Sequence, residues 1–186
     1  MDIDAFVAKA RSVYTGPERK PMRAPGFDYR DPGPYYVTIC SEFRLHRFGS
    51  IAAGEMHLND PGVMVQTAWR SIPRVFPGVT LDAHVVMPNH LHGVLVLAIP
   101  IDGTLNGEAS LSQVMQWLKT ETTNRYIRGV RRHGWDPFQG KLWQRGYWDE
   151  IVRTDARMDE IRAYIATNPA EWDTDTYRDP EPLPFP

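Results

Sequence analysis

The chain has 186 residues, of which 42% are hydrophobic and 11% aromatic, and its formal net charge is -2 at pH 7. This size and apolar content predict one folded domain with a core of its own and exclude a wholly disordered chain. The near-neutral charge gives no overall nucleic-acid signature, and the one cysteine, Cys40, excludes an internal disulfide or a cysteine-built zinc site. No apolar run approaches the ~18 residues of a membrane span and the N-terminus is acidic, so we expect a cytoplasmic protein without a signal peptide.

Residues 1–33 are predicted to form a flexible arm, because the stretch from residue 16 onward is rich in proline, glycine and charge. Its basic side chains, Arg19, Lys20 and Arg23 among them, either contact nucleic acid or are simply solvated. β-Branched and aromatic residues then predict a strand at 35–40. Residues 43–48 either continue this strand or pair with it, and residues 51–58 complete a hairpin with a turn at Gly54.

Cap residues mark the helices and apolar runs mark the remaining strands. Asn59 with Pro61 begins a helix that ends at Pro73, and two strands follow at 79–87 and 91–99. Ser110 caps a second helix and Thr154 a third, which Asn168 and the following proline end. Residues 173–186 form an acidic, proline-rich tail.

The triplet His90-Leu91-His92 lies in an otherwise apolar run. Side chains alternate along a strand, so His90 and His92 leave the same face. Two neutral imidazoles side by side can bind one divalent ion and leave positions open for a substrate oxygen. Two histidines hydrogen-bonded within a core would give the same pattern.

Tyr164 and Asn168 are four residues apart on the last helix and therefore share one of its faces. A metal held by His90, His92 and Asn168 would polarise a phosphodiester, and Tyr164 would be placed to attack it as a nucleophile. Because a phenol has a pKa near ~10, a base or the metal must favour the phenolate. The alternative for Tyr164 is a tyrosine that closes the helix onto the sheet.

The segment from Ser110 to Arg153 carries eight Lys/Arg against four Asp/Glu, together with four tryptophans. Basic charge among aromatic rings is typical of surfaces that neutralise phosphates and stack on unpaired bases. A solvated helix face above core tryptophans is the other interpretation.

Four blocks of the chain carry a resemblance to a known family, and they occur in the family's order. They are YYVTIC at residues 35–40, VVMPNHLHG at 85–93, LWQRGYWDEIVR at 142–153 and YIATNP at 164–169. In these blocks the chain resembles the REP-associated tyrosine transposases, relatives of the single-tyrosine HUH transposases that act on single-stranded DNA. The resemblance covers residues 34–172, which we therefore expect to be a transposase-like catalytic domain.

The resemblance implies a single α+β domain: a ferredoxin-like antiparallel sheet with helices on one face and the His-X-His on a central strand. It implies that His90 and His92 bind Mg²⁺ or Mn²⁺ with Asn168 completing the site, and that Tyr164 forms a 5′-phosphotyrosine link while freeing a 3′-hydroxyl. Relatives recognise short palindromic hairpins. We therefore expect DNA contacts from the arm (Arg19, Lys20, Arg23), the basic helix (Lys119, Arg125, Arg128, Arg131, Arg132) and the block Trp143, Gln144, Arg145.

One departure from the family bears on activity. Many relatives have Asp-His where this chain has Asp149-Glu150, and this matters if that histidine assists DNA binding or proton transfer. The leading prediction is a metal-dependent endonuclease and strand transferase, working as a monomer or a homodimer; the alternative is a domesticated hairpin-binding protein with weak catalysis. A nucleotide hydrolase of the histidine-triad kind would need a third histidine where Val94 stands.

Overall fold

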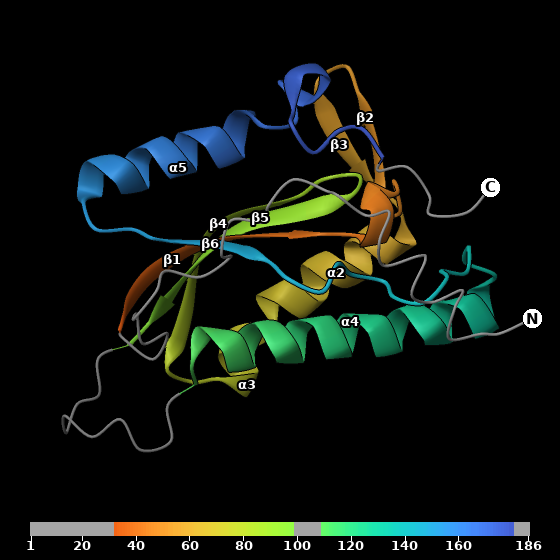
Figure 1. Cartoon of the computed structure of the whole chain (residues 1–186), viewed down its shortest axis with the longest axis horizontal. Coiled ribbons are helices and arrows are strands. Elements are labelled where there is room, and N and C mark those ends of the chain that lie inside the picture. The colour runs from red at the N-terminus through yellow and green to blue at the C-terminus, as the bar shows by residue number, and fades with distance from the viewer. Residues whose placement is uncertain (1–31, 99–108, 181–186) are drawn as a thin grey trace, which may run out of the picture.

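The structure is a computed structural model that describes residues 32–98 and 109–180 (Figure 1). The predicted DNA contacts Arg19, Lys20 and Arg23 lie outside these residues. The strands are β1 (Gly33–Cys40), β2 (Gly49–Ala52), β3 (Glu55–Leu58), β4 (Val79–Val86), β5 (His90–Leu97) and β6 (Trp148–Ile151). The helices are α2 (Asp60–Arg70), α3 (Ile72–Val75), α4 (Leu111–His133) and α5 (Asp155–Thr167), with 3-10 turns η1 (Glu42–Arg44) and η2 (Trp172–Thr174).

Four strands form one antiparallel sheet in the order β4-β5-β1-β6, so β5 and β1 are central. Thr38 on β1 lies opposite His92 on β5, and Cys40 lies opposite His90. Leaving aside the separate β2–β3 hairpin and the short α3, the chain from β1 to β6 runs strand, helix, strand, strand, helix, strand, which is the ferredoxin-like order, and α5 follows as an additional helix. The predicted fold class, with the His-X-His on a central strand, is confirmed.

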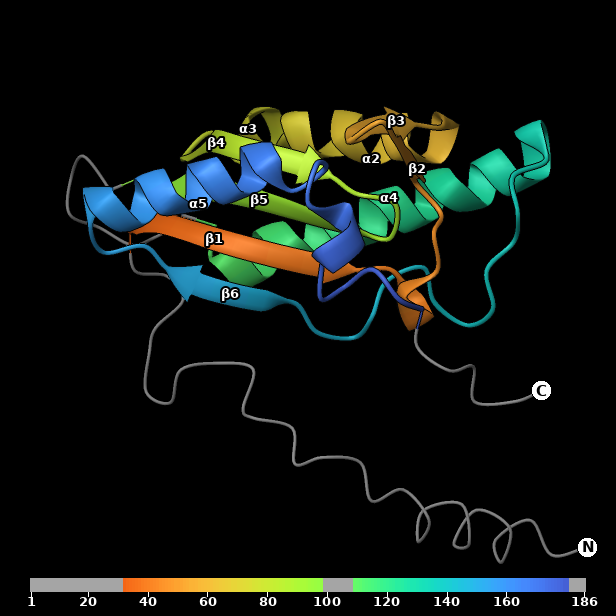
Figure 2. The same cartoon turned by 90° about the horizontal axis from the view of Figure 1, so that it is seen from above.

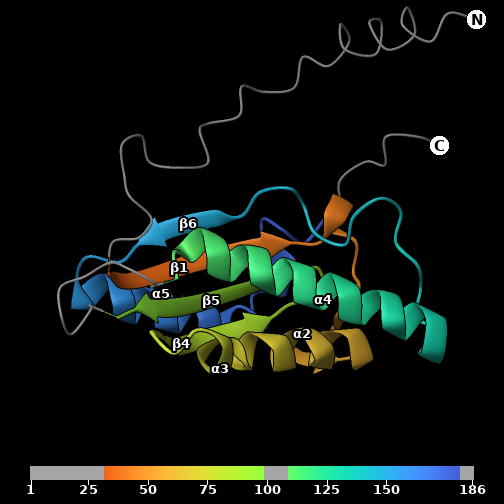
Figure 3. The ribbon, with the colours of Figure 1, turned by 90° about the horizontal axis from the view of Figure 1, so that it is seen from below.

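Helices cover both faces of this sheet, which corrects the expectation that they share one face. α2 and α4 lie on one side and α5 lies on the other (Figures 1 and 3). The central strands are apolar on both sides: Tyr35 and Leu91 join the large core under α2 and α4, while Tyr36 and Val94 pack with Ile161 of α5. A strand that is apolar on both faces needs a cover on each, and α5 supplies the second.

The helix starts follow the predicted caps. The Asn59 side chain accepts from the backbone N–H of Gly62 at 2.9 Å, and Thr154 accepts from Arg157 at 3.2 Å. Ser110 and Gln113 form a reciprocal capping box at the start of α4. These local bonds set where each helix begins, and so which turn of α5 carries Tyr164.

Two segments differ from the expectation. Residues 43–48 do not continue β1, because the chain turns through η1 with positive φ angles at Phe43 (56°) and Arg44 (50°). The four-residue strand β6, for which the sequence predicts no strand, pairs with β1 at the edge of the sheet. None of the helices in the described ranges combines the length and apolar character needed to cross a membrane.

Gly93 lets the helical layer approach β5 directly beside His92. A Cβ at this position would lie 2.3 Å from Cζ2 of the buried Trp69 of α2. Only a residue without a side chain therefore allows the indole to pack under the strand that carries the two histidines.

Candidate active site and metal centre

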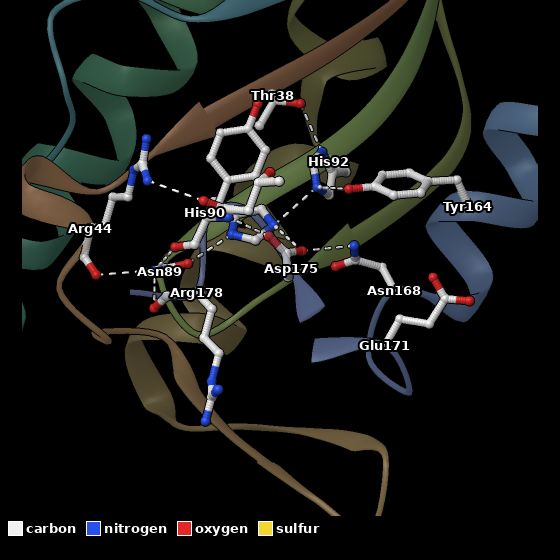
Figure 4. Close-up of polar contacts among 12 residues, drawn as sticks. Thr38, Arg44, Asn89, His90, His92, Tyr164, Asn168, Glu171, Asp175 and Arg178 are labelled. Carbon is white, nitrogen blue, oxygen red and sulfur yellow. Dashed lines mark hydrogen bonds and ion pairs between the residues drawn. The ribbon is translucent and has the colours of Figure 1, made fainter. Parts of the chain in front are cut away.

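His90 and His92 leave the α5 side of β5 and are both fully buried. Their Nε2 atoms lie 3.0 Å apart, and Figure 4 shows the two rings converging on one point. The strand period therefore does bring the two imidazoles together, as the sequence predicts.

The tautomer of His90 follows from its neighbour Asn89. The Asn89 amide nitrogen donates to the carbonyls of Arg44 (3.0 Å) and Tyr177 (2.6 Å), so its oxygen is left to accept from His90 Nδ1 at 2.7 Å. Nδ1 therefore carries the proton and Nε2 presents a lone pair. Burial, followed by the charges of Arg44 and His46, lowers the pKa of His90 to about 3, so the ring is neutral at physiological pH.

His92 is oriented by two hydroxyls of β1. Its Nδ1 lies 2.8 Å from the Tyr36 hydroxyl and 2.7 Å from Thr38 Oγ1. When Nδ1 donates to either oxygen, Nε2 is free to act as a ligand. Burial, reinforced by His90, holds the pKa of His92 well below its usual range, so this ring is neutral as well.

Asn168 and Asp175 add oxygen atoms to the pair of imidazoles. Asn168 caps the C-terminus of α5, is buried, and donates from Nδ2 to Asp175 Oδ2 at 2.9 Å. Asp175 Oδ2 in turn lies 3.8 Å from His90 Nε2. The sequence did not point to Asp175, because it lies in the predicted tail and no motif marks it.

These residues fit a divalent cation. One ligand atom each from His90, His92 and Asp175 lies within 4.8 Å of the others. The Asn168 Oδ1 atom is buried without a hydrogen-bond partner among the described residues, and an unsatisfied buried acceptor costs about 1–3 kcal/mol. The buried Asp175 carboxylate faces two neutral rings, so a cation would supply the charge and the bond that the site lacks. A mixed nitrogen and oxygen donor set suits Mn²⁺ at least as well as Mg²⁺.

Tyr164 reaches the same point from α5. Its hydroxyl lies 3.4 Å from His92 Nε2, and the side chain is partly exposed. Burial, then the charge of Asp175, raises the pKa of Tyr164 to about 12, so the phenol is protonated at neutral pH. The hydroxyl borders a cavity of about 290 Å³ that Tyr36, Trp148 and Tyr177 also line.

Glu150, where the family resemblance implies a histidine, is bound by an arginine. Arg157 of α5 donates to both of its carboxylate oxygens, at 2.7 and 2.9 Å. This hydrogen bonding lowers the pKa of Glu150. The position therefore links the edge strand β6 to the helix that carries Tyr164.

Trp143 and Lys119, two of the predicted DNA contacts, bond to other parts of the protein. Trp143 is buried, stacks near Phe48 with ring centroids 4.9 Å apart, and donates its indole N–H to Thr122 at 2.8 Å. Lys119 donates to the backbone carbonyls of residues 144, 145 and 146, and burial lowers its pKa to about 8. Trp143 thus has no exposed ring face for a base.

The other basic residues lie on the face away from Tyr164. Arg125 pairs with Glu121 at 2.6 Å, whereas Arg128, Arg131 and Arg132 are exposed on α4. Gln144 and the exposed Arg145 line a second hollow, of about 350 Å³, beside α4. The structure therefore gathers Tyr164, His90, His92 and Asn168 at one centre and leaves the predicted basic contacts of α4 across the sheet (Figures 2 and 3).

Comparison with known proteins gives three kinds of similarity. Residues 77–168 match the family model described as "Transposase IS200 like". An uncharacterized protein of Haemophilus influenzae is 33% identical over 164 residues, which cover 84% of this chain and 91% of that protein. Among solved structures, a REP-associated tyrosine transposase bound to a REP hairpin aligns with 80% of this chain and 74% of its own, at 19% identity and a TM-score of 0.55. A putative transposase from Deinococcus radiodurans R1 aligns with 77% of this chain and 95% of its own, at 17% identity and a TM-score of 0.46.

Proposed function

Because this chain belongs to the IS200-like transposase family, as its resemblance to the REP-associated tyrosine transposases implied, we propose that it cleaves and rejoins single-stranded DNA hairpins through Tyr164. The observation that carries the proposal is the 3.4 Å approach of the Tyr164 hydroxyl to His92 Nε2, beside a cavity that Tyr164 and His92 both line. A nucleophile, a cation site and access for substrate meet there. The reaction would take place in the cytoplasm, where the sequence predicts the protein to reside.

The proposed metal ligands are His90 Nε2, His92 Nε2, Asn168 Oδ1 and the Asp175 carboxylate. Mg²⁺ or Mn²⁺ bound by them would supply Lewis-acid stabilisation of the charge that develops on the phosphate and on the phenol oxygen. The chain supplies the preorganisation: Asn89 orients His90, and Tyr36 with Thr38 orients His92, so both rings keep their lone pairs directed at one point.

Tyr164 would act as the nucleophile in an in-line displacement. Its oxygen forms a bond to phosphorus as the bond to the 3′-oxygen of the preceding nucleotide breaks, which leaves a 5′-phosphotyrosine and a free 3′-hydroxyl. The phenol loses one proton and the leaving oxygen gains one, so protons balance. Since burial raises the pKa of Tyr164 to about 12, the phenol would need a base or the cation to reach its reactive form near neutral pH. Attack of another strand's 3′-hydroxyl on the phosphotyrosine would reverse the bond changes and rejoin DNA.

A hairpin-binding protein with weak catalysis is the second candidate function. Burial raises the pKa of Tyr164, which favours it. Glu150 also favours it, because the family resemblance implies a histidine at this position. The solved relative with a bound REP hairpin supports DNA hairpins as the partner of either function.

The test is covalent capture. The protein is incubated with a labelled hairpin from the sequence flanking its gene, with Mn²⁺ or Mg²⁺, and denaturant-resistant adducts are resolved on a gel. We expect an adduct that mass spectrometry maps to Tyr164, lost in Tyr164→Phe and in His90→Ala and dependent on the metal. Hairpin binding without an adduct in the presence of either metal would contradict the proposed catalysis and support the hairpin-binding function instead.

A further inference from the structure

Trp148 is the first residue of β6 and is 44% exposed, which is unusual for so large an apolar side chain. It borders the same cavity as Tyr164 and His92. Within the described parts of the chain, four large hydrophobic side chains are exposed, and Trp148 and Tyr164 are the two that share this cavity. Packing within the protein does not explain why an indole beside the proposed nucleophile is left exposed to solvent.

The plane of the indole is fixed by the residue that orients the metal site. The Trp148 ring meets the Tyr36 ring edge to face, with centroids 5.4 Å apart at 74°. Tyr36 is buried, and its hydroxyl lies 2.8 Å from His92 Nδ1. Trp148 therefore offers an aromatic surface that is held in place relative to His92, as a preformed binding wall should be.

The charges around the cavity leave little attraction for a phosphate backbone. Arg157 lies on its wall but is paired with Glu150 at 2.7 Å and with Glu160 at 2.8 Å. Asp175 adds a further negative charge near Tyr164. Binding at this point must therefore draw on contacts other than protein cations, and stacking on a base is the contact that an exposed indole can make.

We propose that Trp148 stacks on an unpaired base next to the phosphodiester that Tyr164 attacks, and so positions that phosphodiester beside Tyr164 whatever the identity of the base. This inference rests on the proposed function, since it takes single-stranded DNA as the substrate. The cavity of about 290 Å³ is close to the ~300 Å³ lower bound of small-molecule pockets, a size suited to one base rather than to a duplex. Stacking tolerates any base, so Trp148 contributes affinity and position, while sequence is read elsewhere.

The test separates binding from cleavage by using Tyr164→Phe as the background. A fluorescently labelled hairpin with single-stranded flanks is titrated with this protein and followed by anisotropy. We expect Trp148→Ala to raise the Kd by between about 5-fold and 150-fold and Trp148→Phe to raise it less, because the smaller ring still stacks. Val75→Ala, which shortens an equally exposed side chain on α3, should leave the Kd unchanged.

A scan with abasic nucleotides in the flanks identifies the stacked base. One abasic position should weaken binding to the Trp148 protein and have no further effect on the Trp148→Ala protein, because each change removes the same contact. Equal affinities of the Ala, Phe and parent proteins would overturn the proposal for Trp148 while leaving the proposed function intact. Failure of the parent protein to bind the hairpin at all would instead overturn the function on which the inference rests.

Discussion

Each histidine of the site is held neutral by its surroundings, and this has a consequence for the metal. Burial keeps the pKa of His90 near 3 and the pKa of His92 well below its usual range. The two lone pairs therefore stay available in mildly acidic solution, where exposed imidazoles would be protonated.

We expect Mn²⁺ affinity to change by less than about 3-fold between pH 7.5 and pH 5.5, measured by calorimetry. Two imidazoles with ordinary pKa values near ~6.5 would lose about 100-fold over that interval. The free energy of unfolding, in contrast, should depend strongly on pH. Because the folded pKa values lie below the unfolded value, the free energy of unfolding is at its full value above pH 6.5 and falls as the pH drops toward 3. A steep loss of Mn²⁺ affinity with an unchanged unfolding curve would contradict the neutral, buried pair.

Asp175 gives a second prediction at this scale. Asp175→Asn removes a buried negative charge and allows a flipped Asn168 to accept a hydrogen bond at its otherwise unsatisfied Oδ1. We expect Mn²⁺ affinity to fall by at least about 10-fold, while the metal-free protein becomes more resistant to urea. Asp173→Asn is the matched control, because that carboxylate is exposed and only two residues away. Equal Mn²⁺ affinities for the two variants would show that Asp175 is not a metal ligand.

At the scale of elements, ion pairs join α5 to both edge strands of the sheet that it covers. Arg157 binds Glu150 on β6, and Arg162 binds Asp82 on β4 through two bonds of 2.9 and 2.7 Å. Between these two ion pairs, Ile161 is buried against the strands. The position of Tyr164 relative to His92 therefore depends on charged pairs at the rim as well as on apolar packing.

Asp82→Asn should slow formation of the covalent adduct by between about 3-fold and 100-fold, because a small displacement of a nucleophile has a large effect on rate. The control is Asp159→Asn, since Asp159 bonds to the same Arg162 but from within the helix, so it does not join α5 to the sheet. Added salt should slow the parent protein toward the rate of the Asp82 variant. Identical adduct rates for the two variants would show that the edge pair does not position Tyr164.

At the scale of the whole molecule, the two layers of helices meet through the sheet at β5. Gly93→Ala should cost about 1–3 kcal/mol in the free energy of unfolding, because its Cβ would overlap the Trp69 ring under β5. A second change, Trp69→Phe, should recover part of that loss by making room. Urea denaturation of the single and double variants measures both effects, and additive losses would argue against a direct overlap.

The elements that could be predicted from sequence are those with strong local signals. The capped helix starts at Asn59, Ser110 and Thr154 and the alternation that pairs His90 with His92 depend on neighbouring residues alone, and the structure confirms them. The second helical layer and the partners of Trp143 depend on distant parts of the chain. The same holds for Asp175, which lies beside the histidines only because η2 turns the chain back after α5. Contacts between residues far apart in the sequence leave no periodic pattern from which they could be predicted.

The site is drawn from residues 36 to 177, and its parts emerge from the ribosome in a fixed order. The histidine pair on β5 is synthesised well before Tyr164, Asn168 and Asp175. Since domains begin to fold while they are being made, the proposed metal ligands of β5 can be in place before the proposed nucleophile has been synthesised. A nascent chain that ends before residue 164 therefore lacks the proposed nucleophile, and the proposed cleavage requires that both α5 and the segment that carries Asp175 have been translated.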